Sequence, residues 1–153
     1  MQEGVKFIFL GDGARREELT QRAEREGMSN VSFLGFQPEE RFRAILTSAD
    51  ACLVTLQPGM DRLSAPSRAY TFLSAGQPLL AMMPDDSELA ELVTETKTGW
   101  NVLNGRELAE LALTLKENIP EIEKRGVNAR ALYQERFTKD SVSTEYIRLL
   151  GGE

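Results

Sequence analysis

Short apolar runs that alternate with segments of helical spacing are the feature of this sequence that most restricts its fold. Residues 5–10 form a nearly continuous apolar run that ends at Gly11. Runs of this kind are typical of strands that are covered on both faces, as in a parallel sheet. The expected strands occupy residues 5–10, 30–35, 50–56, 79–83 and 100–103. Strands that alternate with helices predict an α/β fold, an open parallel sheet with helices on both faces.

Helical spacing of apolar residues predicts what lies between these strands. Asn104 and Glu107 resemble a capping box, and Pro120 suits the first turn of a helix. The expected helices occupy residues 15–26, 39–49, 67–75, a segment after Ser87, a segment after Asn104, 120–137 and 139–149. No repeat or low-complexity linker interrupts them, so we expect a single domain over residues 1–153. Right-handed crossovers place the carboxyl ends of the strands along one edge, where open α/β sheets bind ligands.

Composition excludes several classes of function. The chain of 153 residues contains no histidine, which excludes a Ser-His-Asp triad, a Cys-His pair and a histidine-based zinc site. Cys52 is the only cysteine, so no intrachain disulfide is expected, which fits a reducing compartment. The net charge of −6 argues against nonspecific binding of nucleic acid. No apolar run approaches the roughly 18 residues of a membrane span, and a cytoplasmic location is expected.

The turn Gly11-Asp12-Gly13 follows the first expected strand and precedes a helix. Glycines let the backbone turn tightly and approach a ligand, and a helix N-terminus favours anions. The dinucleotide-binding pattern is incomplete, because Arg16 replaces the third glycine of G-x-G-x-x-G and no acidic residue follows about 20 residues later. A classical NAD site is therefore not expected. Gly11 and Gly13 are candidate binding residues, and the alternative is a strand-to-helix turn without a ligand.

A second candidate is the loop that enters the helix at residues 67–75. Pro66 fixes the first turn and leaves the free N–H groups of Ser67 and its neighbours pointing outward. The Ser67 hydroxyl and the Arg68 guanidinium add donors that suit a phosphate. The alternative is a surface helix whose Arg68 is merely solvated.

A third candidate is Phe36 with Gln37, directly after the second expected strand. An aromatic ring with an amide beside it suits a base that is stacked and recognised at its edge, and the alternative is that Phe36 fills the core. All three candidates are expected at one edge of the sheet. The basic residues expected near that edge, in an otherwise acidic chain, are Arg15, Arg16, Arg62 and Arg68. A diphosphate needs such local positive charge.

The order and spacing of these segments resemble the C-terminal domain of family 4 glycosyltransferases, which have the GT-B fold. That family reads as a G-D-G turn, an N-V-x-F-L-G strand, an A-D strand, a helix ending A-x-G-x-P-V-L-A and a T-G-W-x-V strand. The corresponding segments here are Gly11–Gly13, Asn30–Phe36, Ala49–Val54, Ser67–Ala81 and Thr98–Val102. The resemblance covers residues 5 to about 149 and implies a Rossmann-like half of a GT-B enzyme.

The resemblance also implies a function. The domain would bind a nucleotide-diphosphate sugar, and the parent enzyme would transfer a hexosyl group to an acceptor glycan or lipid-linked sugar in polysaccharide biosynthesis. The residues implied to contact the donor are Gly11, Gly13, Phe36, Gln37, Pro66, Ser67, Arg68 and Thr71. Arg68 matches a lysine of the P-S-K subgroup and is the expected catalytic residue, because it would stabilise the leaving diphosphate. No cofactor and no required metal are implied, and the parent enzyme is either free in the cytoplasm or peripheral at the membrane.

Two departures from the family pattern matter. The family's E-x7-E pair would fall on Leu63 and Thr71, so both acids are missing. Thr71 can hydrogen-bond a ribose hydroxyl, but without a charge, which weakens donor binding by about 1–3 kcal/mol. The family's domain also begins with one more strand and helix and follows an N-terminal acceptor domain, so we expect a fragment that is inactive alone. Its central gap would be closed by direct pairing of strands 5–10 and 51–56, or by a strand borrowed in a homodimer.

Two other classes of protein stay open. The missing acids at Leu63 and Thr71 favour a catalytically degenerate module that binds nucleotides or a partner. A flavodoxin- or receiver-like signalling domain would need acidic residues at its strand ends, where this sequence has Gly11, Gly35 and Gln57. The acidic helices after residue 104 are a candidate partner surface, although charged helical faces are usually only solvated.

Overall fold

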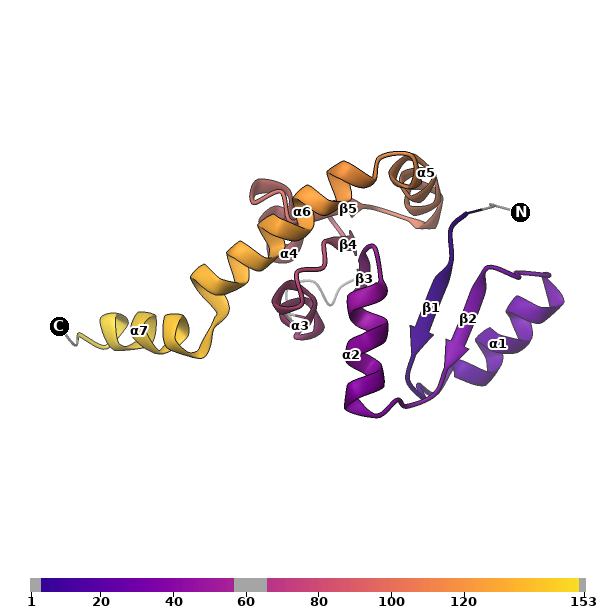
Figure 1. The fold of residues 1–153 in the computed structure, drawn as a ribbon, viewed down its shortest axis with the longest axis horizontal. Coiled ribbons are helices and arrows are strands. Elements are labelled where there is room, and N and C mark those ends of the chain that lie inside the picture. Colours follow the sequence, from indigo (N-terminus) through magenta and orange to yellow (C-terminus); the bar gives the residue numbers. More distant parts are fainter. Residues whose placement is uncertain (1–3, 57–65, 152–153) are drawn as a thin grey trace.

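Helices and strands alternate along the chain as the sequence predicts (Figure 1). The computed structural model describes residues 4–56 and 66–151. The strands are β1 (Phe7–Leu10), β2 (Val31–Leu34), β3 (Cys52–Thr55), β4 (Leu79–Met82) and β5 (Gly99–Val102). The helices are α1 (Arg16–Arg25), α2 (Glu39–Ser48), α3 (Arg68–Ser74), α4 (Glu88–Glu95), α5 (Gly105–Lys116), α6 (Ile119–Leu132), η1 (Tyr133–Phe137) and α7 (Lys139–Leu149). The expected α/β class is confirmed, and the ends of the elements differ from the expected ones by only a few residues.

The strands form two parallel sheets instead of one. β1 pairs with β2, and β4 lies between β3 and β5. The predicted direct pairing of strands 5–10 and 51–56 is wrong, because no ladder joins β1 to β3 in the described residues. The side chain of Phe7 instead packs in the same hydrophobic cluster as Ala51 and Leu53. Side-chain packing, and not a main-chain ladder, therefore connects the two sheets.

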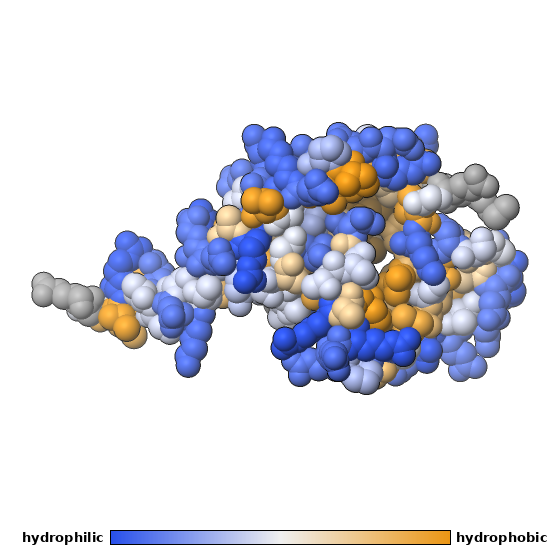
Figure 2. Space-filling model, viewed as in Figure 1, coloured by the Kyte–Doolittle hydropathy of each residue, from blue (hydrophilic) through white to orange (hydrophobic). Residues whose placement is uncertain are grey.

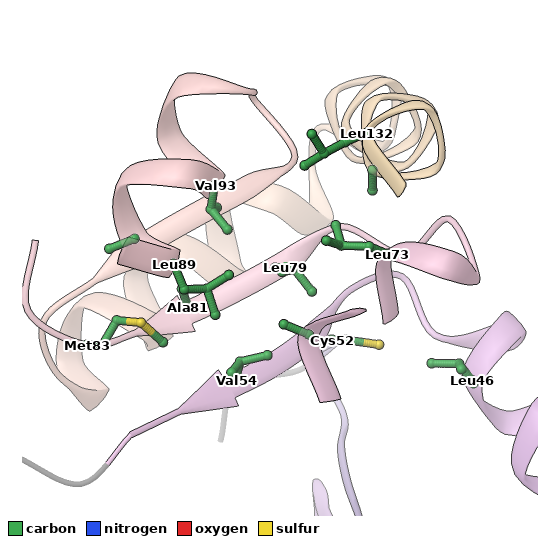
Figure 3. Packing of buried hydrophobic residues seen from close by; sticks show 13 residues of the cluster. Leu46, Cys52, Val54, Leu73, Leu79, Ala81, Met83, Leu89, Val93 and Leu132 are labelled. Carbon is green, nitrogen blue, oxygen red and sulfur yellow. The ribbon is translucent and has the colours of Figure 1, made fainter. Parts of the chain in front are cut away.

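Helices cover both faces of the three-stranded sheet. On one face, Leu79 and Ala81 of β4 are fully buried against α3, α4 and α6, and Figure 3 shows Leu73 and Val93 pointing into this cluster. On the other face, Leu80 of β4 packs with side chains of α5 and α6. Successive residues of a strand point to opposite faces, so a strand covered on both faces needs the continuous apolar run that residues 79–83 supply.

Two glycines mark places where backbone segments touch. A Cβ added at Gly99 would overlap the main-chain oxygen of Leu79, and one at Gly126 would lie 2.8 Å from the main-chain oxygen of Gly76. The first contact sets the spacing of β4 and β5, and the second brings α6 against the turn before β4. No side chain fits at either place.

The predicted capping box at the start of α5 is confirmed. The Asn104 side chain accepts hydrogen bonds from the main-chain N–H groups of Arg106 and Glu107, both at 3.0 Å. The Glu107 carboxylate returns to the N–H of Leu103 at 2.8 Å. These bonds satisfy donors that a helix N-terminus otherwise leaves free.

The C-terminal segment packs against the sheet at its start and reaches away from it at its end. The segment predicted as one helix over residues 120–137 is α6, whose last turn widens into the π-helix η1. α7 then extends beyond the rest of the molecule (Figure 1), and none of its residues is buried. Within the described residues, no helix has the length and apolar character needed to cross a membrane.

Candidate functional site

The turn after β1 is open. Gly11 adopts a φ of 123°, a conformation that residues with a side chain rarely adopt. Its N–H donates to the main-chain oxygen of Leu34 at 2.9 Å, which extends the β1–β2 ladder to the end of the strand. A Cβ at Gly11 or Gly13 would meet no atom within 4 Å. The backbone of this turn is therefore accessible to a ligand.

Asp12 joins this turn to the turn that follows β2. Its carboxylate accepts a hydrogen bond from the main-chain N–H of Phe36 at 3.2 Å and pairs with Arg16 at 2.8 Å. The same carboxylate would lie 3.5 Å from a Cβ added at Gly35. The structure thus brings two of the three predicted candidates together at the carboxyl ends of β1 and β2.

Phe36 and Gln37 present an exposed ring beside an unpaired acceptor. The Phe36 side chain is 85% exposed, so the alternative that it fills the core is wrong. The Gln37 amide donates to the main-chain oxygen of Gly35 at 2.9 Å. Its Oε1 atom is buried and has no hydrogen-bond partner among the described residues. The exposed ring suits stacking on a heterocyclic base, whereas the Gln37 Oε1 atom is shielded from solvent in this conformation.

The third candidate lies at the entry of α3. Pro66 is partly buried, whereas Ser67, Arg68 and Thr71 are exposed. Ser67 and Thr71 stand one turn apart on the helix, so they share a face. The Arg68 side chain has no ion pair and no hydrogen bond within the described ranges 4–56 and 66–151. The alternative prediction, that the Arg68 side chain is solvated and binds no ligand, therefore stays open.

The structure does not join this third candidate to the other two. The segment between β3 and Pro66 lies outside the described residues, and with it lie Arg62, Leu63 and the predicted strand end Gln57. Convergence of the three candidates in one groove stays a prediction.

The C-terminal helices hold α3 in place. Ala69 and Leu73 are buried on its inner side. The Tyr70 ring meets the Phe137 ring edge-on, with centroids 4.8 Å apart. Arg130 of α6 donates to the main-chain oxygen of Ser74 in the last turn of α3. These contacts fix which side of α3 faces outward, and so where its entry points.

Two of the predicted cations are already paired. Arg15 binds Glu18 at 2.9 Å, and this hydrogen bond lowers the pKa of the Glu18 carboxyl. Arg16 binds Asp12. Among the predicted basic residues that the structure describes, Arg68 alone is left without a partner carboxylate. Positive charge for an anion is thus concentrated at α3 and not spread along the edge.

Sequence reasoning missed two polar groups at the strand ends. The glycine-turn pattern accounts for Asp12 only as its middle residue. A short acidic side chain between two glycines is nevertheless a sequence signal for a hydrogen bond to nearby backbone. Asn101 of β5 donates to Asp85, which follows β4, at 2.7 Å, and its Oδ1 atom is buried without a partner among the described residues. No pattern in the sequence marks this second pair.

Parallel strands with helices on both faces, and open glycine and aromatic turns at the strand ends, define a protein of the Rossmann-like α/β class. Comparison with known families identifies it further. The chain belongs to the family described as Glycosyl transferases group 1, whose model matches residues 1–118. The resemblance inferred from the sequence is confirmed.

Known relatives agree with this assignment. A protein named "Probable glycosyltransferase WbjE" from Pseudomonas aeruginosa is 34% identical over 65% of this chain and 25% of its own length. "Putative colanic acid biosynthesis glycosyl transferase WcaI" from Escherichia coli (strain K12) is 24% identical over 98% of this chain and 37% of its own length. The chain therefore spans only a quarter to about two fifths of the length of these relatives.

Solved structures share the fold. A crystal structure of TarM superposes with a TM-score of 0.76 at 18% identity, over 98% of this chain and 29% of that one. A second, a point mutant of S. aureus TarM in complex with Fondaparinux, alpha-GlcNAc-glycerol and UDP, gives 0.73 at 19% identity, over 97% of this chain and 29% of that one. At this identity the likeness concerns the fold, and it confirms the predicted Rossmann-like half of a GT-B fold.

Proposed function

We propose that this chain is the donor-binding domain of a glycosyltransferase, over residues 1–153. It binds a nucleotide-diphosphate sugar, and the parent enzyme transfers the hexosyl group to an acceptor glycan or lipid-linked sugar in polysaccharide biosynthesis. The observation that carries the proposal is the Asp12 bridge, which holds an open glycine turn beside the exposed ring of Phe36. Family membership supports the transfer chemistry. The UDP bound in one TarM complex supports the class of donor.

Each candidate residue has a role in this proposal. The Phe36 ring stacks on the base, and the Gln37 side chain beside it contacts the edge of the base. Gly11 and Gly13 let the main chain approach the donor. The entry of α3 receives the diphosphate, with the partially buried Pro66 shaping the turn and the Ser67 amide as donor.

Arg68 is the proposed catalytic residue. Its unpaired guanidinium binds the diphosphate and stabilises the charge that develops on it as the glycosidic bond breaks. Thr71, exposed one turn further on, hydrogen-bonds the ribose hydroxyls. Catalysis then comes from positioning and from stabilising the leaving group, and the acceptor is held by the remainder of the parent enzyme, without which this chain does not turn over. We place that enzyme in the cytoplasm or at the inner membrane surface.

Titration calorimetry with UDP, GDP and ADP tests the binding step. We expect one of these nucleotides to bind, and we expect Arg68→Ala to weaken that binding several-fold. Arg25→Ala is the matched control, because Arg25 is also exposed but lies at the far end of α1, before β2. Equal affinities of the Arg68→Ala variant and the unmodified chain would remove Arg68 from the site. No binding of any of the three would remove the donor proposal.

A degenerate binding module is the second candidate. It is favoured by Thr71, which offers an exposed hydroxyl at a position where the family pattern has an acid. Such a module binds the nucleotide without supporting transfer. Assays of sugar transfer and of donor hydrolysis by the parent enzyme separate the two candidates, because only a transferase shows either reaction.

A further inference from the structure

A groove lies at the amino ends of β3 and β4, the edge of the sheet opposite the candidate site. It is lined on one side by residues that precede β3 and β4, and on the other side by one face of α6. The groove has a volume of about 420 Å³. A volume of this size accommodates a small organic molecule.

Aliphatic side chains supply much of the lining. Ile119 and Val127 of α6 are 45% and 70% exposed, and Pro78 lines the groove from the side of the sheet. Figure 2 shows separate hydrophobic patches over α6, surrounded by hydrophilic surface. An alkyl chain with charged ends can pack along apolar surface of this kind while its ends reach polar groups.

Gln77 directs an unsatisfied amide into the groove. The residue is 9% exposed, and its side chain has no hydrogen-bond partner among the described residues. It lines the groove, and neither of its amide atoms is sealed from solvent there. The turn before β4 holds it in place, because its main-chain N–H donates to the oxygen of Phe72 at 3.0 Å and Pro78 follows it. Buried amides are normally hydrogen-bonded, so this one marks a place for a polar group of a ligand.

Two carboxylates border the groove without cationic partners. Asp50 precedes β3 and Glu123 lies on α6, and neither has an ion pair within the residues that the structure describes. α2 ends at Ser48 with no basic residue in its last turn, so the partial negative charge of its C-terminus adds to that of Asp50. Arg130, the cation among the described lining residues, donates to the main-chain oxygen of Ser74 at the end of α3. The charge left for a ligand is therefore negative.

We propose that this groove binds a linear aliphatic diamine. One ammonium group pairs with Asp50 and the other with Glu123, and the amide oxygen of Gln77 accepts a hydrogen bond from one of them. The alkyl chain between them lies along the aliphatic side chains. A lysine side chain of a partner protein has the same alkylammonium chemistry, but it brings one charge to a groove with two carboxylates. The proposal is independent of donor binding, because the groove and the candidate site lie at opposite ends of the strands.

Calorimetric titration of the 153-residue chain with putrescine and cadaverine, at low ionic strength, tests the proposal. n-Butylamine is the matched ligand control, because it carries one ammonium group on the same carbon chain as putrescine. We expect the better diamine to bind about tenfold more tightly than n-butylamine. We expect Asp50→Asn and Glu123→Gln each to weaken the diamine by about tenfold, since each removes a charge-assisted hydrogen bond and keeps the shape of the side chain.

Glu40→Gln is the matched control variant. Glu40 is exposed and has no ion pair within the described part of the chain, but it lies in the first turn of α2, at the far end from Asp50. The substitution changes the net charge by the same amount and should leave the affinity unchanged. Gln77→Leu removes the amide while keeping a side chain of similar size, and it should weaken the diamine several-fold. In NMR spectra, the side-chain amide signal of Gln77 should shift during the titration, which locates the ligand in the groove.

Several results would overturn the proposal. One is that neither diamine binds, and another is that a bound diamine leaves the Gln77 signal unmoved. An equal loss of affinity in Glu40→Gln, Asp50→Asn and Glu123→Gln would indicate nonspecific attraction to a chain of net charge −6. Binding of N-acetyl-lysine methylamide as tight as that of the diamines would instead assign the groove to a lysine side chain of a partner protein.

Discussion

Gly99 is a residue whose identity the backbone fixes. Its Cα lies so close to β4 that an added Cβ would overlap the main-chain oxygen of Leu79. We expect Gly99→Ala to lower the free energy of unfolding by about 3 kcal/mol, because neither strand can move without breaking the ladder. Urea unfolding measures the change. Gly105→Ala is the control, since a Cβ there meets no atom within 4 Å, and an equal loss in both variants would contradict the prediction.

Asp12 is the residue on which the paired turns depend. Asp12→Ala removes the acceptor for the Phe36 N–H and the partner of Arg16, so the two turns separate. We expect a several-fold loss of nucleoside diphosphate affinity in calorimetry, with little change in unfolding, because exposed ion pairs stabilise weakly.

Asp12→Asn keeps a carbonyl oxygen that can accept from Phe36, so it should recover much of the affinity. Glu18→Ala breaks the more exposed Arg15 pair, which bridges no turns, and should leave binding unchanged. If Asp12→Ala binds as tightly as the unmodified chain, the bridge has no role in the site.

Cys52 couples stability to alkaline pH. Burial raises the pKa of its thiol from the ordinary 9.0 to about 12. Below pH 9 the thiol is neutral in both the folded and the unfolded chain, so it has no effect there. Between pH 9 and 12 only the unfolded chain ionises, so the folded state loses stability as the pH rises.

The test compares unfolding of the unmodified chain and Cys52→Ala at about pH 8 and about pH 10.5, on either side of the ordinary thiol pKa. We expect the difference in unfolding free energy between them to shrink at the higher pH, because other alkaline groups titrate equally in both. Parallel pH profiles would contradict the assignment. The same burial should keep the thiol unreactive toward disulfide reagents in the folded chain.

At this scale the sequence identified candidates but not their pairing. The order of strand and glycine turn was enough to predict Gly11, Gly13, Phe36 and Gln37 at strand ends. It could not show that Phe36 is exposed, because an aromatic residue after a strand suits a core equally well. Nor could it show that Arg15 and Arg16 are neutralised by Glu18 and Asp12, since such pairs depend on rotamers and not on spacing.

At the scale of elements, α3 depends on the C-terminal segment. Phe137→Ala removes the ring that packs edge-on against Tyr70. We expect a loss of about 2 kcal/mol in unfolding free energy, below the usual cost for a fully buried phenylalanine because Phe137 is only partly buried. Nucleotide affinity should also fall, because the entry of α3 loses its support.

Tyr146→Ala is the matched control, since Tyr146 of α7 is 65% exposed. We expect its effect on unfolding to stay below about 0.5 kcal/mol. Chemical unfolding and calorimetry on the two variants measure both effects. A Phe137→Ala chain as stable as the Tyr146→Ala chain would show that η1 does not support α3.

The positions of the helices and strands could be predicted from the spacing of apolar residues. This succeeds because each strand of the three-stranded sheet packs between helices, and most helices bury only one side. The exception is the end of α6. The predicted helix over 120–137 is right in extent, but its last turn is η1, a π-helix. Periodicity cannot reveal the wider turn, because its position depends on how Tyr133 and Phe137 meet α3 and the buried cluster.

At the scale of the whole molecule, the sequence predicted a gap in the sheet but not how the chain would deal with it. Direct pairing of β1 with β3 would give hydrogen-bond partners to the main-chain N–H and C=O groups on the facing edges of these strands. The structure instead keeps β1 beside β3 through Phe7, Ala51 and Leu53. This preference depends on the volumes of packed side chains from β1, β3 and α5, which linear patterns do not report.

The divided sheet also separates the two ends of the candidate site. The turns that would recognise a base belong to β1 and β2, whereas the helix entry that would receive phosphates follows β3. A hydrogen-bonded ladder holds neighbouring strands at a constant spacing, but no such ladder spans this junction within the described part of the chain. In the proposed site, the distance between the turns for the base and the helix entry for the phosphates would therefore be set by side-chain packing across the junction and not by a main-chain ladder.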